Sequence, residues 1–372
     1  MGRYDLVVVG AGIIGLATAY AACSQGMRVA VVERSDRCVG ASIRNFGFVT
    51  VTGQRRGEHW DRARRSRDIW AHIAPRAGIQ VVHQGLYVVA QREAAVPLLQ
   101  AFLTTEMGEG CQWLEAEHVR HRHPSLNPGR GVLYSPHELR VESRDAIPQL
   151  AQWLASEYAV DFYWNTAVQA IDLPQVFTGR GTISASYCVV CPGADLNALY
   201  PEVLVQARAR LCTLQMLRIQ PNTPLRLPGA VMSDLSLVRY EGYADLPEAQ
   251  PLKEQLVQEQ ADYLQRGIHL IVVQSADGSL VVGDSHVYGT TEAPFACEAT
   301  DTLIMQELHK VLNVSGTHVT QRWTGTYPSA GDVVFKISPA KGVAIGVVTG
   351  GTGASTGFAF GQEILELAIR SA

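Results

Sequence analysis

Three glycines near the start of the chain have the spacing of a phosphate-binding turn. Gly10, Gly12 and Gly15 follow the apolar run Val7–Val9, and Glu33 ends a second apolar run. In such a turn the first glycine permits a tight bend, the second lets the main chain approach a pyrophosphate, and the third lets a helix pack on a sheet. An acidic residue after the second strand accepts a hydrogen bond from a ribose 2′-hydroxyl. The spacing predicts a dinucleotide site; the alternative is a glycine-rich turn that only packs tightly.

A strand, a turn, a helix and a second strand must hold these residues in place. We predict strands over 5–9 and 29–33 and a helix over 13–25, whose free N–H groups and positive dipole end point at the phosphate. The cofactor-binding residues predicted for this turn are Gly10, Ala11, Gly12, Ile13, Ile14 and Gly15.

The composition points to a soluble protein with a small-molecule substrate. Of the 372 residues, 47% are hydrophobic, which suffices for a large core in one or two domains. The net charge of −4 gives no support to binding of nucleic acid or of a membrane surface. We predict no membrane span, because the apolar run 342–360 is rich in glycine and small polar residues.

Cysteine and histidine spacing gives no support to a metal site. The chain has seven cysteines, and Cys188 and Cys191 form a CxxC pair. We interpret this pair as part of a buried strand; a redox pair or half of a zinc site is the alternative. Histidines 118, 121, 123 and 137 also lack the spacing of ligands on one helix. We predict no metal and a reducing, cytoplasmic location.

The residues after Glu33 carry a resemblance to a known family. Glu33-Arg34, then Gly40-Ala41-Ser42 and Gly47, resemble the second signature of the D-amino acid oxidase family of FAD-dependent oxidoreductases, which includes glycine oxidase and monomeric sarcosine oxidase. The resemblance implies FAD in preference to NAD, with Glu33 on the adenosine ribose and Ser42 on the pyrophosphate. The cofactor-binding residues that it implies here are Glu33, Arg34, Ala41, Ser42, Asn45, Phe46 and Gly47.

The end of the chain resembles the C-terminal flavin-binding block of the same family. A run rich in glycine, 349–357, opens the last predicted helix. Such a junction offers N–H groups and a positive dipole end, which would stabilise an anionic reduced flavin; a glycine-rich helix cap is the alternative. The further contacts implied by the resemblance are Val168, Gly193, Gly325, Gly351, Thr352, Gly353 and Ala354. No cysteine follows Cys297, so we expect non-covalent FAD.

The resemblance also implies the fold. We expect a fold of the α/β plus α+β class: a Rossmann-like FAD-binding domain with a second, antiparallel-sheet substrate domain. The expected FAD-binding domain is discontinuous, over 1–84, 142–204 and 320–372, and the substrate domain covers 85–141 and 205–319. Alternating β-branched residues predict antiparallel strands over 205–219 and 230–240. The polar stretch 241–267 is a lid, an oligomer contact or, in our preferred interpretation, a solvated insertion.

The chemistry implied is oxidation of a C–N bond in a small amine, with hydride transfer to flavin N5, hydrolysis of the imine, and oxygen or another acceptor taking the electrons. Four segments together resemble a subgroup associated with aminophosphonate breakdown: 43–49, 283–286, 322–327 and 351–356. The leading substrate is therefore 2-aminoethylphosphonate or its N-methyl derivative. An amino acid oxidase or dehydrogenase of the glycine or sarcosine type, an NAD-dependent dehydrogenase and a non-catalytic FAD-binding subunit are the alternatives.

Candidate catalytic residues are Arg44, Asn45, His286, Tyr327 and Lys336. An anionic substrate asks for arginine and hydroxyl donors, and the candidates for this contact are Arg44, Arg239, Thr326 and Lys336. Asp284 and His286 lie two residues apart on a predicted strand and so share one face. A substrate contact and a structural hydrogen bond remain equally open for His286. We predict a helix over 54–70 that packs one face on the protein and exposes its arginine-rich face to solvent. Steering of an anionic substrate by these arginines is the alternative.

Overall fold

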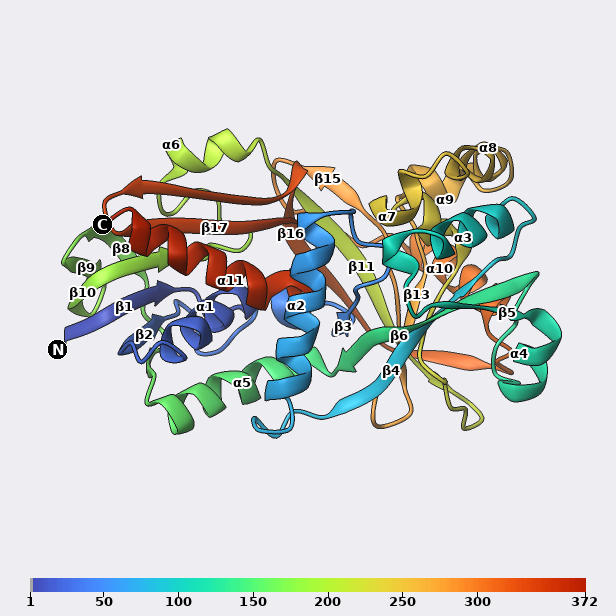
Figure 1. The fold of residues 1–372 in the computed structure, drawn as a ribbon, viewed down its shortest axis with the longest axis horizontal. Helices are drawn as coiled ribbons and strands as arrows, with labels where there is room; N and C mark the ends of the chain where they lie inside the picture. The colour runs from blue at the N-terminus through green and yellow to red at the C-terminus, as the bar shows by residue number, and fades with distance from the viewer. Residues whose placement is uncertain (1–2) are drawn as a thin grey trace.

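The computed structural model describes residues 3–372, which form an elongated molecule (Figure 1). Parallel strands and the helices α1 and α11 lie toward one end, and antiparallel strands with several short helices lie toward the other. Among the described residues, none of the helices is both long and apolar enough to cross a membrane.

A parallel sheet with the strand order β7–β2–β1–β10–β17 occupies the end that holds the N-terminus. Val9 lies opposite both Val32 and Val190. The carboxyl ends of these strands therefore meet at one edge of the sheet, next to the glycine turn. The strands are β1 (Arg3–Val9), β2 (Val29–Val32), β7 (Asp161–Tyr163), β10 (Gly181–Val190) and β17 (Val343–Gly350).

Both faces of this sheet are covered. One face packs on an apolar cluster that includes Leu16 of α1, Leu150 of α5 and Phe358 of α11. The other face packs on strands β8 and β9 and on helix α6, through residues such as Val176 and Leu204. The helices are α1 (Ile13–Cys23), α2 (Glu58–Ile73), α5 (Ser143–Tyr158), α6 (Pro201–Leu204) and α11 (Gly353–Arg370), and the strands are β8 (Val168–Asp172) and β9 (Gln175–Thr178).

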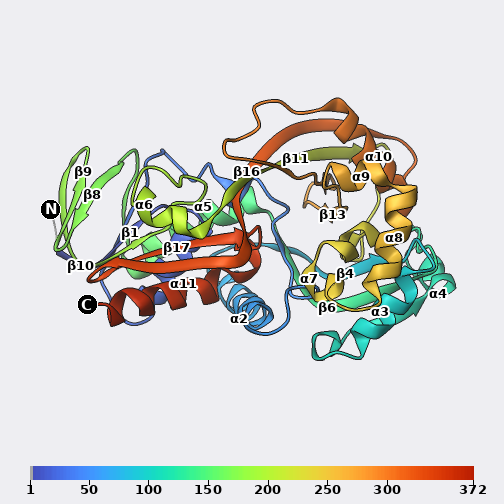
Figure 2. The ribbon, with the colours of Figure 1, turned by 90° about the horizontal axis from the view of Figure 1, so that it is seen from above.

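The other end is built on a mixed, mainly antiparallel sheet with the order β5–β6–β4–β12–β13–β14–β11–β16 (Figure 2). Its strands are β3 (Phe48–Val49), which pairs with β6, then β4 (Val81–Val89), β5 (Gln112–Glu115), β6 (Gly131–Val141), β11 (Arg210–Pro221), β12 (Ala230–Met232), β13 (Ile271–Gln274), β14 (Leu280–Gly283) and β15 (Val287–Gly289). Its helices are α3 (Ala95–Leu103), α4 (Ala116–Arg122), α7 (Glu241–Ala244), α8 (Ala249–Glu259), α9 (Ala261–Gln265) and α10 (Glu298–Val311).

One long strand joins the two ends. Strand β16 (Thr317–Ala340) pairs with β11 over Thr317–Ser329 and with β17 over Ser329–Ala340. Figure 2 shows it running from the antiparallel end into the parallel end. Residues near its middle therefore lie between the two sheets.

The predicted fold class is confirmed, with local corrections. The strand expected over 205–219 begins only at Arg210, after a 3-10 helix over Val205–Ala207. Residues 230–240 were expected to form an antiparallel strand, but only Ala230–Met232 is extended, and it pairs in parallel with β4 and antiparallel with β13. A 3-10 helix over Asp234–Val238 follows it. We propose the division into two domains stated above, with strand β4 running through the boundary at residues 84 and 85.

The stretch 241–267 is built into the core, contrary to our preference for a solvated insertion. Tyr243, Leu252 and Leu256 have no exposed side-chain surface and belong to the large apolar cluster of the antiparallel end. Burial of three such side chains ties the segment to the sheet.

Candidate active site

Only glycine fits at two positions of the first turn. Gly10 has φ of 102°, and a Cβ there would lie 2.5 Å from the carbonyl oxygen of Cys191. A Cβ on Gly15 would lie 1.9 Å from the carbonyl oxygen of Gly10. The turn therefore holds the main chain of β1, β10 and the start of α1 in close contact, as a phosphate-binding turn requires.

The carboxylate of Glu33 and the hydroxyl of Ser42 both hold this turn. Glu33 accepts hydrogen bonds from the N–H groups of Ala11 and Ser35, each 2.9 Å long. Ser42 accepts a hydrogen bond of 2.9 Å from the N–H of Ile13, the first residue of α1. The second signature thus packs directly on the N-terminus of the helix that the first signature opens.

A second helix N-terminus faces the same space. Helix α11 begins at Gly353, and its N-cap residue, Thr352, makes no side-chain hydrogen bond that caps the helix. Gly351 has φ of 70°, and a Cβ there would lie 2.9 Å from the ring of Tyr327. A Cβ on Gly325 would lie 2.8 Å from the carbonyl oxygen of Arg44. These close approaches bring the C-terminal block against the 41–47 segment.

One large cavity connects the two helix N-termini and extends into the antiparallel end. The predicted residues that line it are Gly12, Ile13, Ile14, Gly15, Ala41, Ser42, Arg44, Asn45, Phe46, Gly193, His286, Gly325, Tyr327, Gly351, Thr352, Gly353 and Ala354. Those that do not line it are Gly10, Ala11, Glu33, Arg34, Gly47, Val168 and Lys336. The residues gathered from distant parts of the sequence therefore share one site.

Two of the outlying residues have partners elsewhere. Lys336 lies 2.6 Å from the carboxylate of Glu363, in an outer groove that Arg62 also lines. This position corrects the prediction that Lys336 contacts the substrate. The side chain of Arg34 pairs with Asp195. Arg34 can therefore contribute only its main chain at the sheet edge beside Glu33.

Asn45 holds its own loop in shape. Its Nδ2 donates to the carbonyl oxygens of Ala41 and Ser42 at 2.8 and 3.1 Å, and its Oδ1 accepts from the N–H of Gly47 at 2.6 Å. Both amide atoms are engaged within the loop, so Asn45 positions the segment that presents Arg44 to the cavity, and its assignment as a catalytic residue stays a prediction.

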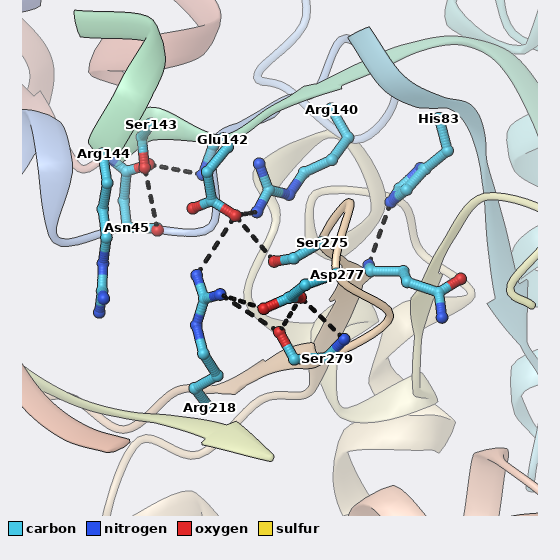
Figure 3. A network of polar contacts seen from close by, with 12 residues as sticks. Asn45, His83, Arg140, Glu142, Ser143, Arg144, Arg218, Ser275, Asp277 and Ser279 are labelled. Atoms are coloured by element: carbon cyan, nitrogen blue, oxygen red, sulfur yellow. Dashed lines mark hydrogen bonds and ion pairs between the residues drawn. The ribbon is translucent and has the colours of Figure 1, made fainter. Parts of the chain in front are cut away.

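A buried polar network supports this loop from behind (Figure 3). Glu142 Oε2 lies 3.2 Å from a guanidinium nitrogen of Arg140 and 3.2 Å from one of Arg218, and it accepts a hydrogen bond of 2.8 Å from Ser275. A Cβ on Gly47 would lie 2.7 Å from Arg140 Nη1. The network therefore ties the 41–47 loop to the β13–β14 turn that carries Ser275.

The antiparallel end contributes a guanidinium to the cavity. Arg239 donates to the hydroxyl groups of Tyr288 and Tyr327, 3.3 Å away in each case. Among residues 3–372 no carboxylate lies within 4.0 Å of it. Thr326 lines the same cavity, and its Oγ1 is buried without a hydrogen-bond partner among the described residues. A cation with phenolic partners and an unpartnered hydroxyl are suited to bind an anionic group.

Asp284 and His286 line the cavity together, as expected for residues that share a face, and a third residue, His269, joins them. The strand is interrupted there: β14 ends at Gly283 and β15 begins at Val287. Burial lowers the pKa of both imidazoles, to about 3 for His286. Sequence reasoning missed His269, because it lies across a hairpin from Asp284 and no local spacing connects the two.

His59 is a second residue that sequence reasoning missed. It lines the cavity, and its Nε2 lies 3.2 Å from Oγ1 of Thr352 at the start of α11. Burial, with the nearby charges of Arg62 and Arg55, lowers its pKa to about 4, so the imidazole is neutral at pH 7. Its place on the buried face of α2 was the only signal, and the many arginines of that helix obscured it.

Comparison with known proteins identifies the family. The family model described as "DAO: FAD dependent oxidoreductase" matches residues 5–367. The chain therefore belongs to this family of FAD dependent oxidoreductases, and the predicted enzyme class and cofactor are confirmed. Membership excludes the NAD-dependent alternative.

Individual relatives are more distant. A glycine oxidase from Bacillus licheniformis is 25% identical over 223 residues, which cover 55% of this chain and 58% of that protein. The match thus spans little more than half the length of this curated relative. The crystal structure of glycine oxidase from Geobacillus kaustophilus has a TM-score of 0.77 at 19% identity and covers 100% of this chain and 96% of that chain. L-proline dehydrogenase from P. horikoshii has a TM-score of 0.75 at 18% identity, covering 99% and 94%.

The cavity fits the cofactor of the family. It offers two helix N-termini, at Ile13 and Gly353, and glycines beside them that leave no room for a Cβ. A long anionic dinucleotide needs N–H donors at its phosphates and close main-chain approach at its ring system.

Proposed function

We propose that this protein oxidises the C–N bond of a small zwitterionic amine, with 2-aminoethylphosphonate or its N-methyl derivative as the leading substrate and with non-covalent FAD. FAD, when bound, would act as the acceptor of the hydride from the carbon next to the substrate nitrogen. The observation that carries the proposal is Arg239, which lines the cavity and whose guanidinium has the phenolic hydroxyls of Tyr288 and Tyr327 as its partners among the described residues.

The residues divide the cavity between cofactor and substrate in this proposal. The turn at Gly12 and the hydroxyl of Ser42 hold the pyrophosphate, and the N-terminus of α11 faces the flavin. Arg239 and Thr326 bind the anionic end of the substrate, and Arg44 provides further positive charge at the junction. The buried side chains of Phe46 and Phe48 exclude water from the reacting carbon.

A phosphonate matches this end better than a carboxylate of the same length in two respects. It has three acceptor oxygens for the guanidinium and hydroxyl donors, where a carboxylate has two, and its second charge is balanced because both Arg239 and Arg44 line the cavity. An oxidase or dehydrogenase of the glycine or sarcosine type is the second candidate, favoured by the glycine oxidases among the relatives.

Anaerobic reduction of the flavin tests the proposal. The purified yellow protein is mixed without oxygen with 2-aminoethylphosphonate, its N-methyl form, glycine or sarcosine, and the loss of flavin absorbance is followed. We expect the two phosphonates to bleach the flavin fastest, and ethylphosphonate, which has no amine, to perturb the spectrum without bleaching it. Bleaching by glycine or sarcosine alone would support the second candidate. Bleaching by none of the amines would favour a non-catalytic FAD-binding subunit.

A further inference from the structure

Three buried side chains converge at one wall of the cavity. The side chains of His269, Asp284 and His286 are 5%, 6% and 3% exposed. His269 Nε2 lies 3.0 Å from Asp284 Oδ1, and His286 Nε2 lies 3.8 Å from Asp284 Oδ2. One ligand atom from each of the three residues lies within 4.8 Å of the other two.

Both imidazoles carry their proton on Nδ1, the ring nitrogen that points away from Asp284. His286 Nδ1 lies 2.7 Å from the carbonyl oxygen of Gly267 and must carry the proton, because a carbonyl only accepts. The hydroxyl of Ser236 donates to the carbonyl oxygen of Leu270, so its oxygen accepts from Nδ1 of His269, 3.3 Å away. Each Nε2 is then an unprotonated base.

Asp284 adds a third base with no donor. Its Oδ1 is buried and receives no hydrogen bond in the described structure, despite the nearby nitrogen of His269. Three Lewis bases that face one another without a shared proton repel, and a buried carboxylate oxygen without a well-aligned donor is costly. A cation between them removes both penalties.

We propose that His269, Asp284 and His286 form a binding site for a first-row divalent cation such as Zn²⁺. Two imidazoles and one carboxylate are a common ligand set for zinc and iron sites that keep open positions. Histidines that bind metals usually donate their other ring N–H to a carbonyl or a similar acceptor, which is what Gly267 and Ser236 provide here. The separations of 3.0 and 3.8 Å bracket the distance between neighbouring ligands around a tetrahedral ion with bonds of about 2.0 Å.

The remaining coordination position opens to the cavity that Arg239 also lines. An anionic oxygen of a molecule in the cavity would complete the coordination. The positive charge of Arg239 lowers the affinity of the site for a cation, and the negative charge of Asp284 offsets this repulsion. The site does not depend on the proposed oxidation, because metal binding is measured without turnover.

Equilibrium dialysis of the flavin-containing protein tests this site. The protein is stripped with a chelator, dialysed against Zn²⁺ and analysed for bound metal and flavin. We expect one additional zinc per chain, with nitrogen and oxygen neighbours at about 2.0 Å by X-ray absorption and no sulfur at about 2.3 Å. The sulfur signal matters because the described chain has free cysteines, including the exposed Cys297.

Variants locate the ion. Asp284→Asn and His286→Gln are expected to weaken zinc binding by at least about tenfold, whereas His83→Gln, a histidine of the antiparallel end outside the cavity, leaves it unchanged. Flavin content and circular dichroism show whether each variant folds, and the X-ray absorption result on the unaltered protein does not depend on any variant. Absence of bound zinc in the unaltered protein, zinc held by sulfur, or equal binding by Asp284→Asn would overturn the proposal.

Discussion

The hydroxyl oxygen of Ser42 caps helix α1 by accepting the N–H of Ile13 at 2.9 Å. The cap comes from the second signature instead of from the residue before the helix, because that position is Gly12, which has no side-chain oxygen to accept a helix N–H. The N-terminus of α1 therefore depends on a loop that itself lines the cavity.

Ser42→Ala should destabilise the protein and weaken its affinity for FAD. Loss of a hydroxyl cap costs about 1 kcal/mol, and the change also removes a donor that we assign to the pyrophosphate. Urea unfolding of the FAD-free protein and a fluorescence titration with FAD measure the two effects. Ser24→Ala, at the other end of α1, is the matched control because its hydroxyl binds only the carbonyl oxygen of Tyr20. Equal FAD affinity in the two variants would contradict the assignment.

Arg239→Lys should raise KM for an anionic substrate far more than it lowers kcat. A lysine keeps the charge but loses the planar fork that contacts several acceptors at once, and a charged hydrogen bond is worth about 1.5–3 kcal/mol, or roughly 10- to 100-fold in KM. Steady-state kinetics with the best substrate of the flavin-bleaching panel provides the measurement. Arg210→Lys is the control, because Arg210 stacks on the Tyr288 ring and does not line the cavity. A KM within twofold of the original protein would remove Arg239 from the substrate site.

Lys336→Met should leave KM for the substrate within about twofold of its original value. The ammonium group binds Glu363 in the outer groove and is 38% exposed, so the expected loss is less than about 1 kcal/mol of stability. The same kinetic assay, with thermal unfolding, checks both statements. A tenfold rise in KM would show that Lys336 reaches the substrate after all.

Glu142→Gln should lower the free energy of unfolding by about 3 kcal/mol at neutral pH, because it leaves Arg140 buried without its counter-ion and leaves Arg218 with only the more exposed Asp277 as a carboxylate partner. Burial alone raises the pKa of Glu142, but Arg140, Ser275 and Arg218 together hold it below its usual value. A lowered carboxyl pKa stabilises the folded state above the unfolded pKa, near 4.3, and this stability is lost as pH falls through the folded value.

The gap between Glu142→Gln and the original protein should therefore be widest above about pH 5 and should shrink below about pH 4. Urea unfolding over this pH range measures it. Glu366→Gln provides a surface control, because its partner Arg370 is 78% exposed and little change is expected. A gap that stays constant with pH would show that the charge of Glu142 does not carry the effect.

Local signals in the sequence were sufficient for the cofactor end. The glycines of both turns and the acid after β2 act through neighbours in the chain or through helix ends, so their spacing alone predicts their place. The fold class followed from the resemblance to the family that these residues and the C-terminal block carry. Their individual roles toward FAD remain predictions.

The positions of the residues that we assign to the substrate depend on the register of strand pairing, and no local sequence pattern specifies that register. Lys336 and Tyr327 lie on one strand, β16, but the pairing of this strand shifts between Ser329 and Val334 and again after Ile337. Tyr327 lines the cavity and Lys336 does not. An odd number of positions separates them, so regular alternation already places them on opposite faces, and the shift after Ser329 prevents a simple count of faces from the sequence. In the same way His269 meets Asp284 only across a hairpin, and His59 reaches the site only because α2 packs beside α11.

The order in which the cavity is assembled has a consequence for biosynthesis. Strand β10 is flanked by β1 from the start of the chain and by β17 from its end, and the cavity wall includes residues from Gly12 to Ser355. A nascent chain emerging from the ribosome can form the first glycine turn early, but it lacks the second helix terminus until almost all of these residues have been translated. The complete cavity can therefore form only after Ser355 has been translated, and until then the partly made sheet exposes strand edges that promote aggregation.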